Sequence, residues 1–271
     1  MRGSGCDDGP NGAGVRVPDC PPVCAPGRDA GQVPVYAPAC MEEFIAKSDW
    51  EVLRRVTCLA QERGLRFAVG GGFATSFYTA FWRNTKDLDL CVLPQDRDAM
   101  VQITKDAGFG DLHDEKPYDR GWIYRATVDG LIVDIIWQLA NYRGEVDDGW
   151  LASGPEVSIH GDRLRLVPPE EMIWSKIHVV QRDRCDFPDI VNILYACGAR
   201  MDWAGLLKRL DGEERLLASV VSLYTWLAPG QARTIPEWVW QKLGLPQPSD
   251  SLQRDDDRIR RIDSRPWFSP I

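Results

Sequence analysis

The stretch Gly70–Leu90, GGGFATSFYTAFWRNTKDLDL, contains three consecutive glycines, an apolar run of helical length and two aspartates separated by one leucine. The glycines follow the strand-like run Arg66–Val69, and the spacing predicts a helix over Phe73–Trp82. Leu88–Leu93, closed by a proline, is predicted to be the next strand. This order of strand, glycine turn, helix and strand indicates a mixed sheet with helices packed on it.

Three aspartates are candidates for metal chemistry. Asp87 and Asp89 are two apart on a predicted strand, so both carboxylates point to one face, roughly 6 to 7 Å apart at the backbone. Asp134 lies within the apolar run Leu131–Trp137, where a carboxylate is costly unless it binds a cation or pairs with a donor. Magnesium prefers such hard oxygen ligands together with substrate phosphates. The alternatives are a solvated strand face for the first two and pairing with an arginine for Asp134.

The glycine turn is a candidate phosphate site. Gly71 and Gly72 leave backbone N–H groups bare at the start of a helix, and Thr75 and Ser76 add hydroxyls, an arrangement that favours phosphate binding. Close packing of helix on strand is an equally good reason for a single glycine, and we favour it for Gly70. The neighbouring carboxylates strengthen the functional interpretation.

The remaining pattern predicts an α+β fold with a mainly helical C-terminal region. Helices are expected at Met41–Arg63 and Asp96–Ala107, and a hairpin is expected from Trp122–Val128 and Leu131–Trp137 around Asp129-Gly130. A second hairpin is expected from Val157–His160 and Arg163–Val167 around Gly161-Asp162. Further helices are predicted at 169–182, 188–197, 202–210 and 213–227.

Composition divides the chain into four parts. Residues 1–40 hold seven Gly and seven Pro and are predicted to be a disordered or loosely attached arm. The parts that follow are a core at 41–142, a small hairpin plus helical accessory domain at 143–246, and a charged, solvated tail at 247–271.

Charge and cysteine usage narrow the function classes. The net charge of -8 argues against broad electrostatic capture of nucleic acid. No apolar run is long enough for a membrane span, so we expect a cytoplasmic protein without membrane contact. Cys58, Cys91, Cys185 and Cys197 are expected to be reduced core thiols. The three histidines lack metal-ligand spacing, which disfavours zinc hydrolysis, and four cysteines in the first forty residues remain a weak zinc alternative.

Together these motifs resemble the polymerase-beta-like nucleotidyltransferase superfamily. The resemblance rests on Gly71-Gly72-Phe-Ala-Thr75, on Arg83-Asn-Thr85-Lys-Asp87-Leu-Asp89-Leu90, and on Asp134 in a later strand, and it covers about residues 42–210. Many members carry serine in place of Thr75, and Ser76 could serve equally. The form is similar to a branch containing abortive-infection and toxin-antitoxin enzymes and antibiotic (lincosamide and aminoglycoside) nucleotidyltransferases.

The resemblance implies a mechanism and a set of site residues. Asp87 and Asp89 would hold two Mg²⁺ ions, and Asp134 would ligate one of them and activate an acceptor hydroxyl. The nucleoside triphosphate co-substrate would be bound by the remaining candidates: Gly71, Gly72, Thr75, Ser76, Arg83, Thr85, Lys176 and Arg184. Lys176 and Arg184 belong to accessory motifs that also include Asp186 and Asp189, one of which is expected to cap a helix.

The resemblance leaves the partners open. The acceptor is expected to be a small antibiotic-like molecule, or a tRNA or protein as in toxin-type members, and an antitoxin partner is an option. The oligomeric state is not indicated by the sequence. The competing functions are a non-catalytic nucleotide-binding or partner-binding module, and transfer of the γ-phosphate. Retention of all three aspartates argues against the first of these, because clustered carboxylates without a metal repel one another.

Overall fold

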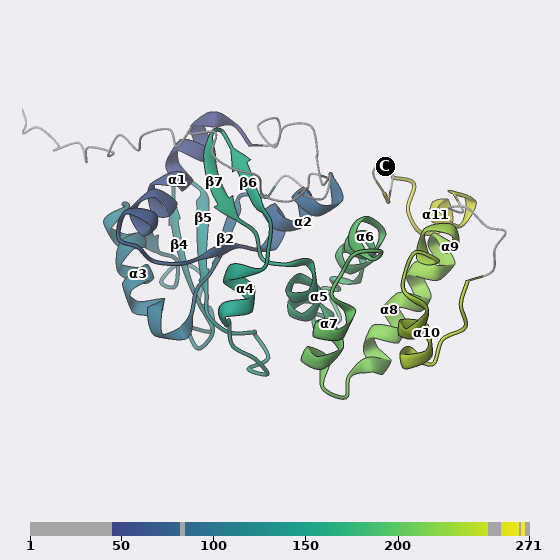
Figure 1. Ribbon diagram of the computed structural model, residues 1–271. Helices are drawn as coiled ribbons and strands as arrows, with labels where there is room; N and C mark the ends of the chain where they lie inside the picture. The colour runs from purple at the N-terminus through teal and green to yellow at the C-terminus, as the bar shows by residue number, and fades with distance from the viewer. Residues whose placement is uncertain (1–44, 82–84, 249–255, 266, 269–271) are drawn as a thin grey trace, which may run out of the picture.

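The computed structural model describes residues 45–81, 85–248, 256–265 and 267–268 (Figure 1). The expected arm at 1–40, and Arg83 among the site residues, lie outside this part of the chain. Within it, five strands form one mixed sheet in the order β1-β2-β5-β4-β3. These strands are β1 (Ala68–Val69), β2 (Asp87–Cys91), β3 (Gly110–Asp111), β4 (Ile123–Val128) and β5 (Leu131–Ile136). Strands β2 and β5 are parallel and the other pairs are antiparallel, so the expected α+β class is confirmed.

One face of the sheet is covered by two amphipathic helices. Helix α1 (Lys47–Glu62) and helix α3 (Arg97–Asp106), which follows the short 3-10 helix η2 (Pro94–Asp96), lie together beside the sheet (Figure 1). The alternate residues Leu88 and Leu90 of β2 are completely buried. Because side chains alternate along a strand, the carboxylates of β2 point to the opposite face.

The hairpin between β4 and β5 forms as predicted. Asp129 and Gly130 have φ angles of 52° and 79°, the two positive values that a two-residue turn of this kind requires. Val128 pairs with Leu131 next to the turn, and the ladder continues through Arg125 and Asp134. This register decides which side chains meet at the site.

The second hairpin has a different turn from the one expected. Strands β6 (Glu156–Ile159) and β7 (Asp162–Arg165) are joined by His160 and Gly161, with φ of 48° and 89°, and not by Gly161-Asp162. Asp162 belongs to the strand, where its carboxylate accepts hydrogen bonds from Trp50 and Arg54 of α1 at 2.7 to 2.8 Å. This tertiary contact sets the register. The short helix α4 (Asp148–Ala152), which the pattern did not predict, precedes the hairpin.

The rest of the chain is helical, as expected, with additional short helices. The helices are α5 (Pro169–Ile177), α6 (Phe187–Cys197), α7 (Trp203–Leu210), α8 (Glu214–Leu227), α9 (Pro229–Ala232), α10 (Glu237–Leu243) and α11 (Asp256–Ile262). The helix predicted at 169–182 therefore ends five residues early. The chain turns back after Ile177, because the N–H of Asp186 bonds the carbonyl of Val179 at 3.0 Å and closes a loop.

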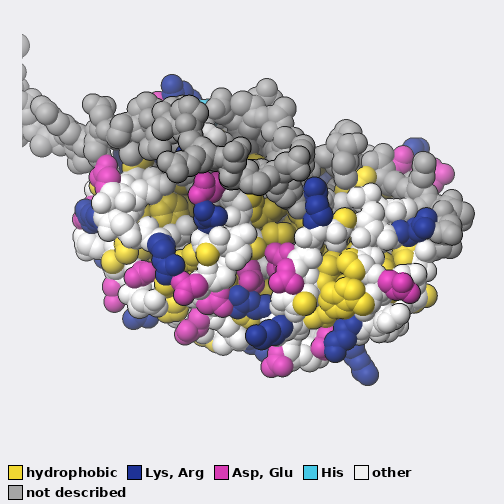
Figure 2. All heavy atoms as spheres, viewed as in Figure 1, with side chains coloured by type: hydrophobic (Ala, Val, Ile, Leu, Met, Phe, Trp, Pro, Cys, Tyr) yellow, Lys and Arg dark blue, Asp and Glu magenta, His cyan; other side chains and the backbone are white. Residues whose placement is uncertain are grey.

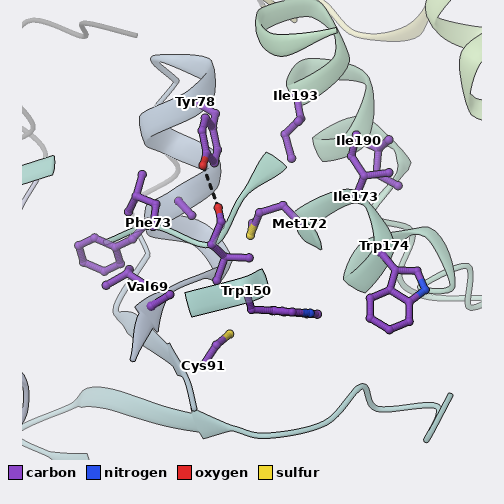
Figure 3. Packing of buried hydrophobic residues seen from close by; sticks show 14 of the residues in the cluster. Val69, Phe73, Tyr78, Cys91, Trp150, Met172, Ile173, Trp174, Ile190 and Ile193 are labelled. Atoms are coloured by element: carbon purple, nitrogen blue, oxygen red, sulfur yellow. Dashed lines mark hydrogen bonds between the residues drawn. The ribbon is translucent and has the colours of Figure 1, made fainter. Parts of the chain in front are cut away.

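A shared apolar cluster joins the sheet to these helices. Helix α2 (Gly71–Thr79) lies between them, and Figure 3 shows its Phe73 and Tyr78 together with Met172 of α5 and Ile190 of α6. The Tyr78 hydroxyl donates a 2.8 Å hydrogen bond to the carbonyl of Val167, just before α5. The glycine turn, the sheet and α5 are therefore held in one packed unit.

Two expectations about the surface need correction. The charged tail is not simply solvated, since Ile259 and Phe268 are buried and Phe268 stacks on Tyr195 of α6 with ring centroids 4.1 Å apart. Of the four cysteines expected in the core, Cys58, Cys91 and Cys197 are buried, but Cys185 is exposed because it lies in the loop between α5 and α6.

Two further observations concern the surface as a whole. On the face in Figure 2, the Lys and Arg side chains of the coloured, described residues are interspersed with Asp and Glu, and form no continuous basic surface. Within the described part of the chain, every helix is too short or too polar to cross a lipid bilayer.

Candidate functional site

Three neighbouring strands place a row of charged side chains on the open face of the sheet. Asp89 of β2 pairs in register with Asp134 of β5, and Asp134 pairs with Arg125 of β4. Residues that pair directly point to the same face, so these three side chains lie side by side. Asp87, two residues before Asp89, belongs to the same face. The sheet therefore brings the three predicted aspartates together.

The glycine turn packs directly against Asp89. Gly71 has a φ of +54°, and a Cβ atom placed there would lie 1.7 Å from Asp89 Oδ2 and 2.4 Å from its Cγ. The N–H of Gly70 also bonds the Asp89 carbonyl at 2.9 Å. Only glycine allows both this backbone conformation and this close approach. Gly71 is needed for the position of the carboxylate and not merely for helix packing.

Burial and neighbouring negative charges disfavour the ionised form of Asp89. Burial, and then the neighbouring Asp134 and Asp87, raise the pKa of Asp89 to about 7, against the opposing influence of Lys176 and Arg125. Burial also raises the pKa of Asp134, against the hydrogen bonds from Arg125. The site thus carries more negative charge than its own cations balance, which is the condition that favours binding of an additional cation.

Asp134 is held by an arginine that the sequence reasoning did not identify. Arg125 Nε and Nη2 donate to the two Asp134 oxygens at 2.9 Å each, and Nη2 is 3.8 Å from Asp87 Oδ2. Pairing with an arginine, one of the two alternatives for Asp134, is therefore present. The signal was available, because Arg125 and Asp134 are equally far from the Asp129-Gly130 turn and must pair across the hairpin.

The predicted hydroxyl ligands are placed unequally. Thr75 Oγ1 donates to the Gly71 carbonyl at 2.9 Å, within its own helix, whereas Ser76 Oγ is buried and has no partner among the described residues. Thr85 packs against Gly72, where an added Cβ would lie 3.0 Å from the threonine side chain. Its hydroxyl also accepts from the N–H of Asp87 at 3.3 Å. Thr85 therefore supports the start of the aspartate strand.

Lys176 and Arg184 lie in a charged cluster at the junction of α5 and α6. Lys176 Nζ donates to Asp186 at 3.0 Å and to Asp189 at 2.8 Å, with all three side chains less than one tenth exposed. Arg184 Nε donates to Asp186 at 3.0 Å. The positive charge of Lys176 acts to lower the pKa of Asp89. Asp186 occupies the N-cap position of α6 and Asp189 lies in its first turn, as expected for one of them, but Asp186 makes no side-chain capping bond and both carboxylates bind Lys176.

The carboxylate oxygens have the right chemistry for magnesium, but their grouping is incomplete. Within the described ranges, no three His, Cys, Asp or Glu side chains are gathered closely enough to hold a metal ion. Asp87 and Asp89 are available to a cation, while both oxygens of Asp134 are occupied by Arg125. The buried Ser76 hydroxyl of α2 has no hydrogen-bond partner in the described chain.

Carboxylates on adjacent strands, next to a glycine turn that opens a helix, define a class of proteins that act on phosphate-bearing substrates. The chain belongs to the family described as "Uncharacterised nucleotidyltransferase", whose model matches residues 50–228. The protein is accordingly a nucleotidyltransferase. Among curated proteins, no sequence matches it.

The solved structures to which the chain is similar include antibiotic nucleotidyltransferases. ANT(2″)-Ia, in a crystal structure with adenylyl-2″-tobramycin, is 19% identical with a TM-score of 0.46, covering 66% of this chain and 99% of its own. The lincomycin-bound lincosamide antibiotic adenylyltransferase LnuA is 16% identical with a TM-score of 0.39, covering 53% and 94%. JHP933 from Helicobacter pylori is 12% identical with a TM-score of 0.38, covering 81% and 98%.

Proposed function

We propose that this nucleotidyltransferase moves a nucleoside monophosphate from a nucleoside triphosphate to an acceptor hydroxyl and depends on magnesium. The observation that carries the proposal is the packing of Gly71 against Asp89, which joins a phosphate-binding turn to the paired carboxylates. Asp87 and Asp89 would hold the metal. Bound there, Mg²⁺ would neutralise the phosphates and make the α-phosphorus more electrophilic.

The residues of this chain would divide the remaining work. Asp134 accepts the proton of the acceptor hydroxyl, whose oxygen forms a bond to the α-phosphorus as the bond to the bridging oxygen of the β-phosphate breaks. Pyrophosphate leaves with the electron pair of that bond. Backbone N–H groups at Gly71 and Gly72, with Ser76, would bind the triphosphate. Lys176, the cation expected to join them, is paired with Asp186 and Asp189.

The test is transfer of label from α-labelled nucleoside triphosphates in the presence of Mg²⁺. Aminoglycosides, lincosamides, tRNA and the protein itself are offered as acceptors, because both small and macromolecular acceptors are compatible with the family. We expect one acceptor class to be labelled, and Asp87→Asn and Asp89→Asn to abolish labelling. The matched control is Asp98→Asn, an exposed acid of α3 outside the site, which retains the wild-type rate.

Two results would contradict the proposal. Undiminished transfer by Asp87→Asn or Asp89→Asn would remove these residues from the metal site. Label that reaches an acceptor only from γ-labelled triphosphate would instead show phosphotransfer, and full activity in the presence of a chelator would show that no metal is needed.

A further inference from the structure

The positive charge of Arg125 lies beside two of the three aspartates of the site. Its guanidinium binds both oxygens of Asp134 at 2.9 Å and approaches Asp87 Oδ2 to 3.8 Å. One side chain from β4 thus spans carboxylates of two other strands. A planar guanidinium that binds a carboxylate through two parallel hydrogen bonds forms one of the stronger polar contacts in proteins.

The two partners are buried unequally, so Arg125 is the one that can move toward solvent. The Asp134 side chain is only 5% exposed, whereas that of Arg125 is 33% exposed. Once another cation takes its place at Asp134, Arg125 can therefore move toward solvent, while Asp134 stays in the sheet beside Asp89. The other nearby cation, Lys176, is committed to Asp186 and Asp189.

The carboxylates themselves require a cation. Asp87, Asp89 and Asp134 would bring three negative charges to one face, and a buried carboxylate left without a partner is strongly destabilising. Arg125 meets this need in the metal-free protein. The same bonds occupy both oxygens of Asp134, and no three-carboxylate metal group is assembled within the described residues.

We propose that Arg125 is the resident counter-ion of Asp134, and that a divalent cation and Arg125 compete for this carboxylate. The inference rests on the proposed function, since it assumes that Asp87 and Asp89 receive the metal. Arg125 is a positioning residue: it pairs with Asp134 and orients it in the free protein, and it releases Asp134 when the site is loaded. The site is thereby protected from binding metal tightly before the nucleotide arrives.

The test is Mn²⁺ binding to the full chain without nucleotide, followed by electron paramagnetic resonance of the free ion. Arg125→Gln removes the competing charge, and we expect binding about tenfold tighter than wild type, a change that corresponds to roughly 1.4 kcal/mol. Arg125→Lys, which keeps the charge but loses the paired hydrogen bonds, is expected to lie between the two and guards against failure of the first variant to fold. In both variants, Mn²⁺ should raise the melting temperature more than it does in wild type.

The matched control is Arg120→Gln, which removes the same charge from a nearby exposed arginine that pairs with Asp111. It should leave the Mn²⁺ affinity unchanged, because we attribute the tighter binding to loss of the Arg125–Asp134 pair and not to loss of a positive charge in general. Affinity that is unchanged or weaker in both Arg125 variants would overturn the competition. Wild-type binding that persists in Asp87→Asn would instead overturn the metal assignment of the proposed function, so the two failures are distinguishable.

Discussion

At the scale of single residues, the site depends on contacts that leave no room for substitution. Gly71 has no side chain because Asp89 occupies the space where a Cβ would lie. Asp134 can remain charged inside an apolar strand because Arg125 binds both of its oxygens. The positions of Asp89 and Asp134 therefore depend on the identity of one neighbouring residue each, Gly71 and Arg125.

Substitution of Gly71 by alanine tests this restriction. The positive φ costs about 1 kcal/mol for a residue with a Cβ, and the new atom displaces the Asp89 carboxylate as well. We expect transfer activity to be lost while the fold is retained, as measured by labelled transfer and by the melting temperature.

The control for Gly71→Ala is Gly64→Ala. Gly64 has a φ of +70° but no atom within 4 Å of an added Cβ, so it isolates the backbone strain. It should lower stability by a similar amount and leave transfer intact. Equal activity of the two variants would show that the contact with Asp89 does not matter for function.

At the scale of elements, regular patterns predicted the strands and helices well, and tertiary contacts decided their ends. The hairpin of β4 and β5 was predictable because Asp129-Gly130 favours only one turn geometry. The predicted position of the β6–β7 turn was wrong by one residue, because Arg54 and Trp50 of helix α1, distant in the sequence, bind Asp162 within the strand. Helix α5 was predicted too long, because the loop that places Asp186 beside Lys176 is formed by contacts remote from the local pattern.

The pairing of α5 with α6 through Lys176 predicts an acid-sensitive fold. Burial alone would raise the pKa of Asp186, but Arg184 and Lys176 outweigh it and lower that pKa below its ordinary value of 3.8. A lowered carboxyl pKa stabilises the fold at pH values above the unfolded-state pKa, and this contribution is lost as the pH falls through the folded-state pKa. We expect unfolding free energy from urea titrations to fall below about pH 4.

Lys176→Met should reverse the dependence of the unfolding free energy on pH. It leaves two buried carboxylates without their shared cation, which costs about 3 to 5 kcal/mol at neutral pH. Protonation of Asp186 relieves part of that cost, so the variant should gain stability relative to wild type as the solution is acidified from pH 7 toward pH 4. A variant whose stability follows the wild-type pH profile would show that the buried bonds of Lys176 contribute little.

At the scale of the whole molecule, the sheet and the helices form one packed unit around α2 (Figure 1). The C-terminal residues take part in it, which charge composition alone did not indicate. Phe268 is only 4% exposed and stacks on Tyr195, although it follows a run of charged residues. Together with Ile259, this aromatic residue brings a polar segment onto the helices.

Substitution of Phe268 by alanine tests that anchor. Removal of a buried phenylalanine side chain costs about 3 to 5 kcal/mol, and we expect a loss of this size. Thermal and urea unfolding measure the change. Arg260→Ala, at a side chain that is 71% exposed on α11, is the control and should have little effect. If the two variants were equally stable, the burial of Phe268 would contribute little, and the tail would be solvated as the sequence predicts.

The sequence by itself determined the class of fold, the aspartate strand, the glycine turn and the hairpin that carries Asp134, because each follows from local periodicity and turn chemistry. The tertiary structure alone decided that Arg125 holds Asp134, that Lys176 binds Asp186 and Asp189, and that Phe268 is buried. These contacts join residues from different elements, and their free energy depends on distance and burial in the folded chain, neither of which local pattern records.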